Sequence, residues 1–447
     1  MTPAELRASI GLAGIFGLRM LGMFIILPVF ALYAEKLPGG SNHTLVGIAL
    51  GAYGLTQACL QIPFGWLSDR WGRKRVIYLG LAVFAIGSFI AAAAASVEMV
   101  IAGRIIQGAG AISAAVIALA ADLTRDNQRT KTMAIIGMTI GATFALSMAA
   151  GPVLDRLLGV PGIFAMTGCL AAAALLVVRF VIPDPQRPAA RPAARQASFL
   201  SVLRDPQLLR LNYGIFALHG ILMAIFVVVP FALQSYLPAA SHWRVYLPVM
   251  LGAIALMLLP MLLAERRQAQ KPVFLGAIGV LLCALGLLGV AEGLAGLVAG
   301  LLLFFTAFNL LEATLPSMIS KQAPAAAKGT AIGVYGTVQF IGTFFGAACG
   351  GWLSQHHGAP SVFAFCGVLA IIWLLLAIGM RVPRALETRR YQLPRIDAGA
   401  ASGLAHSLSG LPGVREVSLS GEGVAYLKVD SKGFDEENVI KLLAGEN

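Results

Sequence analysis

Four charged or titratable side chains fall inside apolar stretches of this sequence, namely Glu312, His219, Arg104 and Arg19. A charge in hydrocarbon is costly, so each of them is a functional hypothesis by default. Asn309 lies one helical turn before Glu312 and on the same face. If this face borders a cavity, the Glu312 carboxyl can carry a proton, and the His219 imidazole, which titrates near neutral pH, is a second proton carrier or a substrate contact.

Each of these residues also has a purely structural interpretation. Glu312 can be a buried carboxyl that is paired for packing, and His219 can be a hydrogen-bonded histidine between helices. Arg19 does not release its proton easily. It either sets the field of a cavity or contacts an anionic group, or it holds a carboxylate or the carbonyls of a helix end. Arg104 is a candidate for proton coupling. The glutamines Gln57, Gln61 and Gln107, together with Asn309, are predicted to line a cavity.

A second constellation lies between two apolar stretches, where residues 65–75 read Gly-Trp-Leu-Ser-Asp-Arg-Trp-Gly-Arg-Lys-Arg. Asp69 ends one stretch, Arg73 begins the next, and Asp122 lies at the same end of a later stretch. Three alternating charges at one end of the molecule can form an ion-paired latch between helices. Simple retention of cations on one side of the membrane is the alternative, but it explains neither Asp69 nor the glycines Gly65 and Gly72.

The elements that must position these residues are membrane spans. The chain has 447 residues, of which 58% are hydrophobic and 12% charged, as in a polytopic membrane protein. Apolar stretches of about 20 residues, long enough to cross the hydrocarbon core, recur from about residue 10 to residue 380. Twelve are predicted, with centres near Phe24, Tyr53, Phe84, Ile112, Ala145, Ala171, Ile225, Ala253, Leu281, Phe304, Gly336 and Ile371.

The cations predict the orientation. The loops that follow even-numbered spans carry most of the Lys and Arg, whereas the odd-numbered loops carry only Lys36, Arg156 and Arg244. Cytoplasmic loops retain cations, so both termini are predicted to be cytoplasmic. The net charge of +12 is then a topology signal that needs no nucleic-acid partner, and it is compatible with contacts to anionic membrane lipids.

The predicted organisation is two six-span bundles followed by a small soluble domain. Residues 1–182 form the first bundle, 183–206 a Pro-rich cytoplasmic linker, and 207–380 the second bundle. Residues 381–393 form a basic linker with a first strand near Tyr391. Residues 394–447 are predicted to form the remaining elements, so that the order is β-α-β-β-α. This order is that of a ferredoxin-like α+β fold that lacks its fourth strand. The expected fold class is therefore an all-α membrane protein with a cytoplasmic α+β tail.

Other classes of protein are excluded by what the sequence lacks. All five cysteines lie within predicted spans without metal-ligand spacing, so neither a disulfide framework nor a metal site is expected. There is no Gly-Lys dipeptide and hence no P-loop, and no arrangement of catalytic residues indicates an enzyme. We expect no cofactor, and a proton gradient as the energy source.

The motif Gly-x-x-x-Asp-Arg-x-Gly-Arg-Lys resembles the loop between spans two and three of major facilitator superfamily transporters. The residues in register are Gly65, Asp69, Arg70, Gly72, Arg73 and Lys74. Arg104 with Gln107, Gly108 and Gly110 resembles the span-four signature of the same family. Gly151-Pro152 matches only part of its antiporter motif, since Ser147 stands where a glycine is usual. The tail is similar to the ferredoxin-like YAM domain that accompanies this fold.

This resemblance implies a proton-driven exporter of small, drug-like molecules in a bacterial inner membrane, working by alternating access. It also implies that the latch of Asp69, Arg73 and Asp122 stabilises the outward-facing state. Its partners would be a small-molecule substrate, protons and lipids, while the tail would contact its own bundles or a second copy of the chain. An alternative remains open: a membrane sensor that binds a ligand without transporting it and signals through the tail.

Overall fold

The computed structural model describes residues 1–125, 128–184, 199–266, 269–323, 328–380, 386–392, 398–420, 424–430 and 433–444. Most of the predicted linker at residues 183–206 lies outside these ranges, as do Asp397 and residues 421–423 of the predicted tail domain. The chain divides into two compact units, Met1–Met380 and Arg381–Asn447. Each unit is described by itself.

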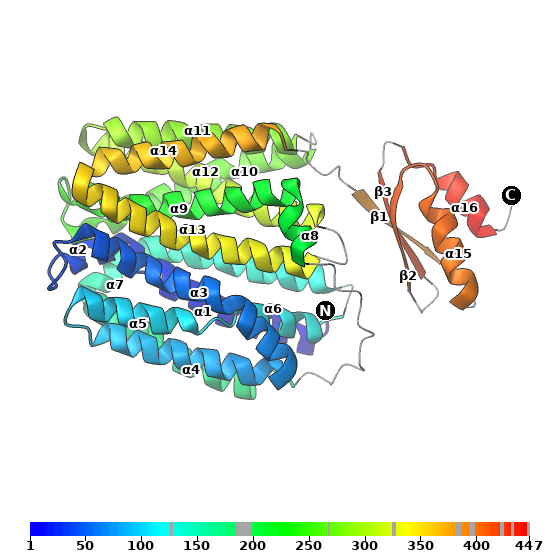
Figure 1. Cartoon of the computed structure of the whole chain (residues 1–447), viewed down its shortest axis with the longest axis horizontal. Helices are drawn as coiled ribbons and strands as arrows, with labels where there is room; N and C mark the ends of the chain where they lie inside the picture. The colour runs from blue at the N-terminus through cyan, green and yellow to red at the C-terminus, as the bar shows by residue number, and fades with distance from the viewer. Residues whose placement is uncertain are drawn as a thin grey trace. The chain divides into compact units, whose positions relative to one another are not determined.

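The first unit is helical throughout its secondary structure and consists of two halves (Figure 1). The helices of the first half are α1 Pro3–Phe24, α2 Leu27–Ala34, α3 His43–Trp71, α4 Arg73–Ala92, α5 Val97–Ala109, α6 Ser113–Asp122 and α7 Arg129–Phe180. Those of the second half are α8 Phe199–Arg204, α9 Pro206–Gln234, the 3₁₀ turn η2 Ala239–Ser241, α10 Trp243–Arg266, α11 Gln270–Val290, α12 Gly293–Gln322, α13 Lys328–His357 and α14 Ala359–Ile378.

Eleven helical stretches of the described residues are long and apolar enough to cross a membrane. Two of them, Pro3–Ala34 and Val97–Asp122, each combine two consecutive α-helices, and a third, Ala239–Ala264, combines η2 with most of α10. Helix α7 is interrupted at Gly159, whose φ of 69° is a left-handed conformation that glycine adopts without strain. The spans predicted around Ala145 and Ala171 lie on the two sides of this break, so the sequence-based prediction of an all-helical membrane protein with about twelve spans is confirmed.

The helix starts follow from local sequence. Thr2 and Glu5 form a capping box at the start of α1, with Pro3 as the first helical residue. The Asp205 carboxylate caps α9 by accepting from the backbone N–H groups of Gln207 and Leu208, and it also precedes a proline. Such side chains accept hydrogen bonds from backbone N–H groups that have no partner within the helix.

Helix α13 lies between α3 and α9 (Figure 1) and packs closely against both, because glycines face each contact. A Cβ on Gly51 of α3 would lie 2.9 Å from the Cα of Phe344, and one on Gly346 of α13 would lie 1.9 Å from the carbonyl oxygen of Gly220. Small residues let membrane helices approach to backbone contact. The two halves of the unit therefore meet along α3 and α13.

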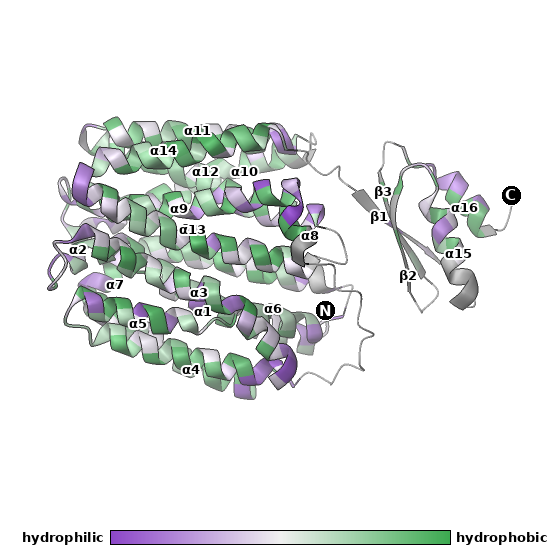
Figure 2. Cartoon of the chain, viewed as in Figure 1, coloured by the Kyte–Doolittle hydropathy of each residue, from purple (hydrophilic) through white to green (hydrophobic). Residues whose placement is uncertain are grey.

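Hydrophilic residues gather at the two ends of the helical unit, with apolar residues between them (Figure 2). We call the end where α3 passes into α4 the basic end, since it holds Arg70, Arg73 and Lys74. The opposite end, where α3 begins and α13 finishes, is called the far end. A membrane that covers the apolar band leaves both ends in water.

The second unit contains a three-stranded antiparallel sheet in the order β1-β3-β2. Its elements are β1 Leu386–Gln392, α15 Ala398–Ser409, β2 Val414–Ser420, β3 Val424–Asp430 and α16 Glu436–Ala444. The first strand begins several residues before the position predicted near Tyr391. Leu408 of α15 and Val439 of α16 share a buried core with Ala425, Leu427 and Val429 of β3, so both helices cover the same face of the sheet.

Candidate functional site

Arg19 of α1 is almost completely buried, at 1% exposure, and all of its hydrogen-bond partners are neutral. Its Nη1 donates to the Ser113 hydroxyl over 2.6 Å, and its Nη2 donates to the Tyr53 hydroxyl over 3.1 Å and to the Gln57 amide oxygen. Its Nε has no partner in the structure. These contacts gather α1, α3 and α6 around a guanidinium group, and among the described residues no carboxylate pairs with it.

Arg104 of α5 is fully buried in a separate neutral cluster of the same half. It donates to the carbonyls of Gly22 and Leu50 and, over 2.7 Å, to Gln107, whose own amide donates to Ser88. The structure thus places Gln107 in the interior of the first half, as a partner of Arg104.

The Tyr53 side chain lies between the two arginines. Its hydroxyl accepts from Arg19, and its ring centroid is 4.9 Å from the Arg104 guanidinium carbon, a cation–π contact. A Cβ on Gly108 would lie 2.3 Å from the Tyr53 carbonyl oxygen, so the glycine of the span-four signature allows close helix contact there.

Gln57 and Gln61 extend the Arg19 cluster to the boundary between the halves. The Gln57 amide donates to Gln61 over 3.5 Å, and Gln61 donates over the same distance to the Gly333 carbonyl of α13. Aromatic rings from both halves also meet in the unit. The Phe144 ring of α7 lies 4.9 Å from that of Phe24 and 5.1 Å from that of Phe308 of α12.

In the second half the structure brings His219 and Glu312 together. His219 Nδ1 lies 3.8 Å from Glu312 Oε2, and neither atom has a hydrogen-bond partner in the structure. His219 is fully buried, whereas the Glu312 side chain is 27% exposed. The Gln339 amide nitrogen lies 2.8 Å from His219 Nε2. When this amide donates, the neutral imidazole carries its proton on Nδ1, which faces the Glu312 carboxylate.

Several further buried polar groups of this half lack hydrogen-bond partners in the structure, among them the Asn309 amide nitrogen and the Tyr335 hydroxyl. Asn309 precedes Glu312 by one turn of α12, as the sequence analysis anticipated. Tyr335 and Gln339 lie on α13, and sequence reasoning missed both of them because they are uncharged residues of types common in membrane helices.

The predicted latch residues Asp69, Arg73 and Asp122 lie together at the basic end. Arg73 pairs with Asp69 at the end of α3 and, over 3.3 Å, with Asp122 at the end of α6. We call these three residues the latch cluster. All three belong to the first half, so the cluster joins helices within that half.

The neighbouring residues of the loop motif shape the turn. Gly72 has a φ of 98°, a conformation that L side chains rarely adopt. A Cβ on Gly65 would lie 3.3 Å from Ala114 of α6, and the Arg70 guanidinium covers the Trp66 ring at 3.9 Å. These contacts position Arg73 between the two carboxylates.

Other contacts at the basic end were not anticipated from the sequence. Arg125 forms a bidentate pair with Glu5 at 2.8 and 3.1 Å, which ties the start of α1 to the segment after α6 and raises the pKa of the Arg125 guanidinium. Lys74 donates to the Ile182 carbonyl and pairs with Asp184 at 2.7 Å. This lysine holds the pKa of the Asp184 carboxyl below its usual range.

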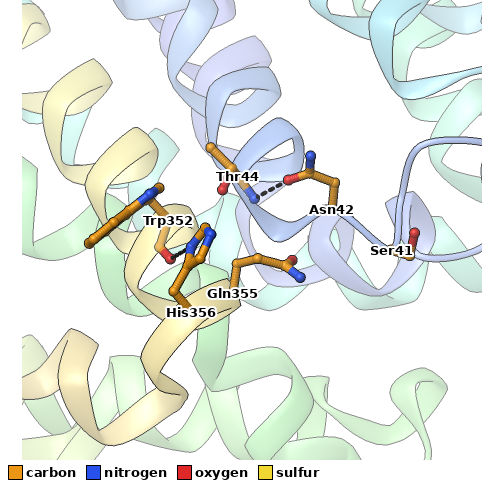
Figure 3. Close-up of a pocket in the computed structure, with 6 residues that line it drawn as sticks. All are labelled: Ser41, Asn42, Thr44, Trp352, Gln355 and His356. Carbon is orange, nitrogen blue, oxygen red and sulfur yellow. Dashed lines mark hydrogen bonds between the residues drawn. The ribbon is translucent and has the colours of Figure 1, made fainter.

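A pocket opens at the far end between the start of α3 and the end of α13 (Figure 3). Its lining residues are Ser41, Asn42, Thr44, Trp352, Gln355 and His356. Next to it, the His43 backbone donates to Gln355 over 2.7 Å, and the His43 ring contacts Ser354 at 3.1 Å. The two halves are therefore hydrogen-bonded to each other at this end. Among the described residues, no group of three His, Cys, Asp or Glu could hold a metal ion.

Comparison with known proteins gives these clusters a context. The chain is 45% identical to the inner membrane transport protein YajR of Escherichia coli strain K12, over 99% of this chain and 98% of that protein. It is 26% identical to a quinolone resistance protein, NorA, of Staphylococcus aureus, over 51% of this chain and 55% of that protein.

The fold has counterparts among solved structures. A bacterial homologue of the human lysosomal transporter Spinster, in an inward-facing and occupied conformation, matches with a TM-score of 0.70 and 14% identity, over 85% of this chain and 97% of that chain. A model of the Major Facilitator Superfamily matches residues 12–347 and, in a second match, residues 313–410. Since the first match alone spans most of the chain, this protein belongs to the Major Facilitator Superfamily and is a membrane transporter, not an enzyme.

Proposed function

We propose that this transporter is proton-coupled, with His219 and Glu312 as the proton site, and that it exports small, drug-like molecules by alternating access. A single observation carries the proposal. The His219 Nδ1 and Glu312 Oε2 atoms face each other at 3.8 Å without other partners. With a neutral imidazole and a carboxylate, one added proton can be shared by both groups and neutralises the pair, and its release restores the negative charge of the carboxylate. Such a site responds strongly to protonation.

Alternating access gives the pair its role. Glu312 is partly exposed while His219 is fully buried, so the carboxyl is the group that exchanges protons with water. Burying the Glu312 carboxyl costs more free energy when it is charged than when it is protonated. Its protonation therefore favours one arrangement of the two halves over the other. No bound cofactor is needed, because the proton gradient supplies the free energy.

The location and direction are proposed on other grounds. The similarity to YajR supports an inner-membrane location, and the similarity to a quinolone resistance protein supports export of drug-like molecules. The cations at the basic end support a cytoplasmic position for this end and for both termini, in contact with anionic lipids. The proteins reported above are transporters or a resistance protein, so the comparisons do not favour the sensor alternative.

The latch cluster is proposed to stabilise the outward-facing state. In its support, Arg73 is shared by carboxylates from two helices, so that α3, α4 and α6 are held together at the basic end. We further propose that the second unit is a ferredoxin-like domain of the YAM type, which contacts its own bundles or a second copy. The outer edge of β1 has no partner strand among the described residues and supports the second alternative. Removing the chain after Met380 should then alter flux or oligomeric state.

The test of the proton site is proton movement in proteoliposomes that hold a pH gradient. The panel contains lipophilic cations, sugars, amino-acid derivatives and organic anions, and it is applied to wild type, Glu312→Gln and Glu292→Gln. Glu292 is an exposed residue just before the same helix, so its variant is the matched control.

We expect a transported compound to dissipate the gradient through wild type and the Glu292 variant, but at least about tenfold more slowly through Glu312→Gln. Equal rates in all three proteins would show that Glu312 is not the coupling group. Transport of a compound by wild type without any proton movement would exclude proton coupling altogether.

A further inference from the structure

Among the described residues, the two buried arginines of the first half have no carboxylate partner to supply the counter-charge that a buried cation ordinarily has. Each donates only to neutral groups, and each retains an Nε without a partner. The described carboxylates that pair with cations in this half do so at the basic end, with Arg73, Lys74 and Arg125. A buried charge without a counter-ion is costly, and neutral hydrogen bonds offset only part of that cost.

The two arginines differ in what surrounds them. Arg104 lies among Gly22, Leu50 and Gln107, entirely inside the first half. The Arg19 cluster reaches the boundary between the halves through Gln57 and Gln61. Gln61 contacts α13 there through a hydrogen bond of 3.5 Å to the Gly333 carbonyl, and the Tyr53 ring of the same cluster lies 6.4 Å from the Phe340 ring of α13. Separating α3 from α13 would break these contacts together with the glycine-lined packing of the two helices, and it would uncover the amides that cover Arg19.

We propose that Arg19 is the recognition site for an anionic group on the substrate, and that the substrate is an organic anion with an aromatic or apolar body. This inference rests on the proposed transport function and deepens it. The anion would supply the missing counter-charge, with Ser113, Tyr53 and Gln57 holding the guanidinium in place. The rings of Phe24, Phe144 and Phe308, which bring both halves together, suit an aromatic body.

The site also separates two tasks. An arginine guanidinium does not release its proton easily, so Arg19 can attract an anion once the amides that cover it are uncovered. The titratable pair lies in the other half, and the His219 ring lies 5.9 Å from the Phe308 ring of the aromatic group. A substrate between the halves can thus contact a fixed charge on one side and the neighbourhood of the proton site on the other.

The test compares three probes with the same skeleton, namely phenylacetate, phenylethanol and phenylethylamine, which are anionic, neutral and cationic at neutral pH. Binding to the purified full-length protein is measured by calorimetry without any pH gradient. The proteins are wild type, Arg19→Gln, Arg19→Lys and the control Arg156→Gln, which changes an exposed arginine of the same half.

We expect wild type and Arg156→Gln to bind phenylacetate about tenfold or more tightly than the neutral and cationic probes. Arg19→Gln should lose this preference while its melting temperature is unchanged or raised, since a buried unpaired charge has been removed. Arg19→Lys should keep part of the preference, and it serves as the test if Arg19→Gln does not fold.

Two results would overturn the inference: equal binding of the three probes by wild type, or an anion preference that survives in Arg19→Gln. Either result leaves the proton-site proposal standing if Glu312→Gln still abolishes proton movement. Conversely, an anion preference that depends on Arg19 would persist in Glu312→Gln even if proton coupling fails, so the two proposals can be separated.

Discussion

The two halves of the helical unit have the same arrangement of helices at the basic end, but they bury different kinds of ionisable side chain. The first half buries Arg19 and Arg104 among neutral partners, whereas the second half places His219 beside Glu312. An arginine keeps its charge at every accessible pH, while a carboxyl and an imidazole change theirs. The buried arginines and the buried titratable pair therefore lie on different sides of the boundary between the halves.

One hydrogen bond at the basic end occurs in both halves. Lys74, at the start of α4, donates to the Ile182 carbonyl, and Lys271, at the start of α11, donates over 2.7 Å to the Ile378 carbonyl at the end of α14. In each half a lysine therefore holds the end of the last span, as expected of an internal repeat. The two halves therefore have a common arrangement of helices and differ in their buried side chains.

Placing an acid beside Arg19 should have the largest effect. Gln57→Glu introduces a carboxylate where the Gln57 oxygen already accepts from Arg19. The new ion pair should stabilise the protein by about 1 kcal/mol, as charge-assisted hydrogen bonds do, and weaken phenylacetate binding about tenfold or more. Melting temperature and calorimetric affinity provide the measurement.

Gln107→Glu is the matched control, because it gives Arg104 the same partner inside the first half. It should leave the affinity for phenylacetate unchanged. If both variants weaken binding equally, the contrast between the two arginines is wrong.

Removing the titratable ring from the second half should have the next largest effect. His219→Gln keeps a hydrogen-bonding side chain but cannot be protonated, so substrate-driven proton movement should fall several-fold. Initial rates in proteoliposomes over the range of about pH 5 to 8, where histidines titrate, measure it. His242→Gln, at another buried histidine of the same half, is the control. A rate unchanged in His219→Gln would place the proton on Glu312 alone.

A smaller effect is expected from the latch cluster. Asp69→Asn and Asp122→Asn each remove one ion pair at a partly exposed site, which should cost at most about 1 kcal/mol of stability. Because both carboxylates share Arg73, the double variant should cost a different amount from the sum of the single variants. Thermal unfolding of the three variants provides this cycle. Strict additivity would contradict a shared cluster.

The smallest effect concerns the pair of Lys74 and the exposed Asp184. The pKa of the Asp184 carboxyl is lowered by Lys74, so the pair stabilises the protein above the unfolded pKa of about 3.9. The difference in melting temperature between wild type and Asp184→Asn should be small and constant from about pH 5 to 8, and it should vanish as the pH falls below about 4. A difference that grows on acidification would have the wrong sign.

The sequence predicted the parts that depend on spacing. Asp69 and Arg73 are four residues apart and pair across the turn between α3 and α4. The spans also followed directly from runs of apolar residues.

The missed parts depend on contacts between distant residues. Glu5 and Arg125 pair across 120 positions, and the partners of Arg19 and His219 are a serine, a tyrosine and amides that carry no charge pattern. The strand Leu386–Gln392 was placed too late because its basic residues obscured the alternation that indicates a strand. A single sequence does not reveal which spans converge, so neutral partners of a buried charge stay hidden.

The glycine-lined contact between α3 and α13 should respond to salt differently from the ion pairs of the basic end. That contact is backbone against backbone at Gly47, Gly51 and Gly54, and the described residues place no ion pair in it. Dissolved salt screens exposed charges but leaves dispersion contacts in hydrocarbon unaffected. Salt should therefore loosen the latch cluster while leaving the seam between the halves intact, so a change in salt concentration acts on only one end of the transporter.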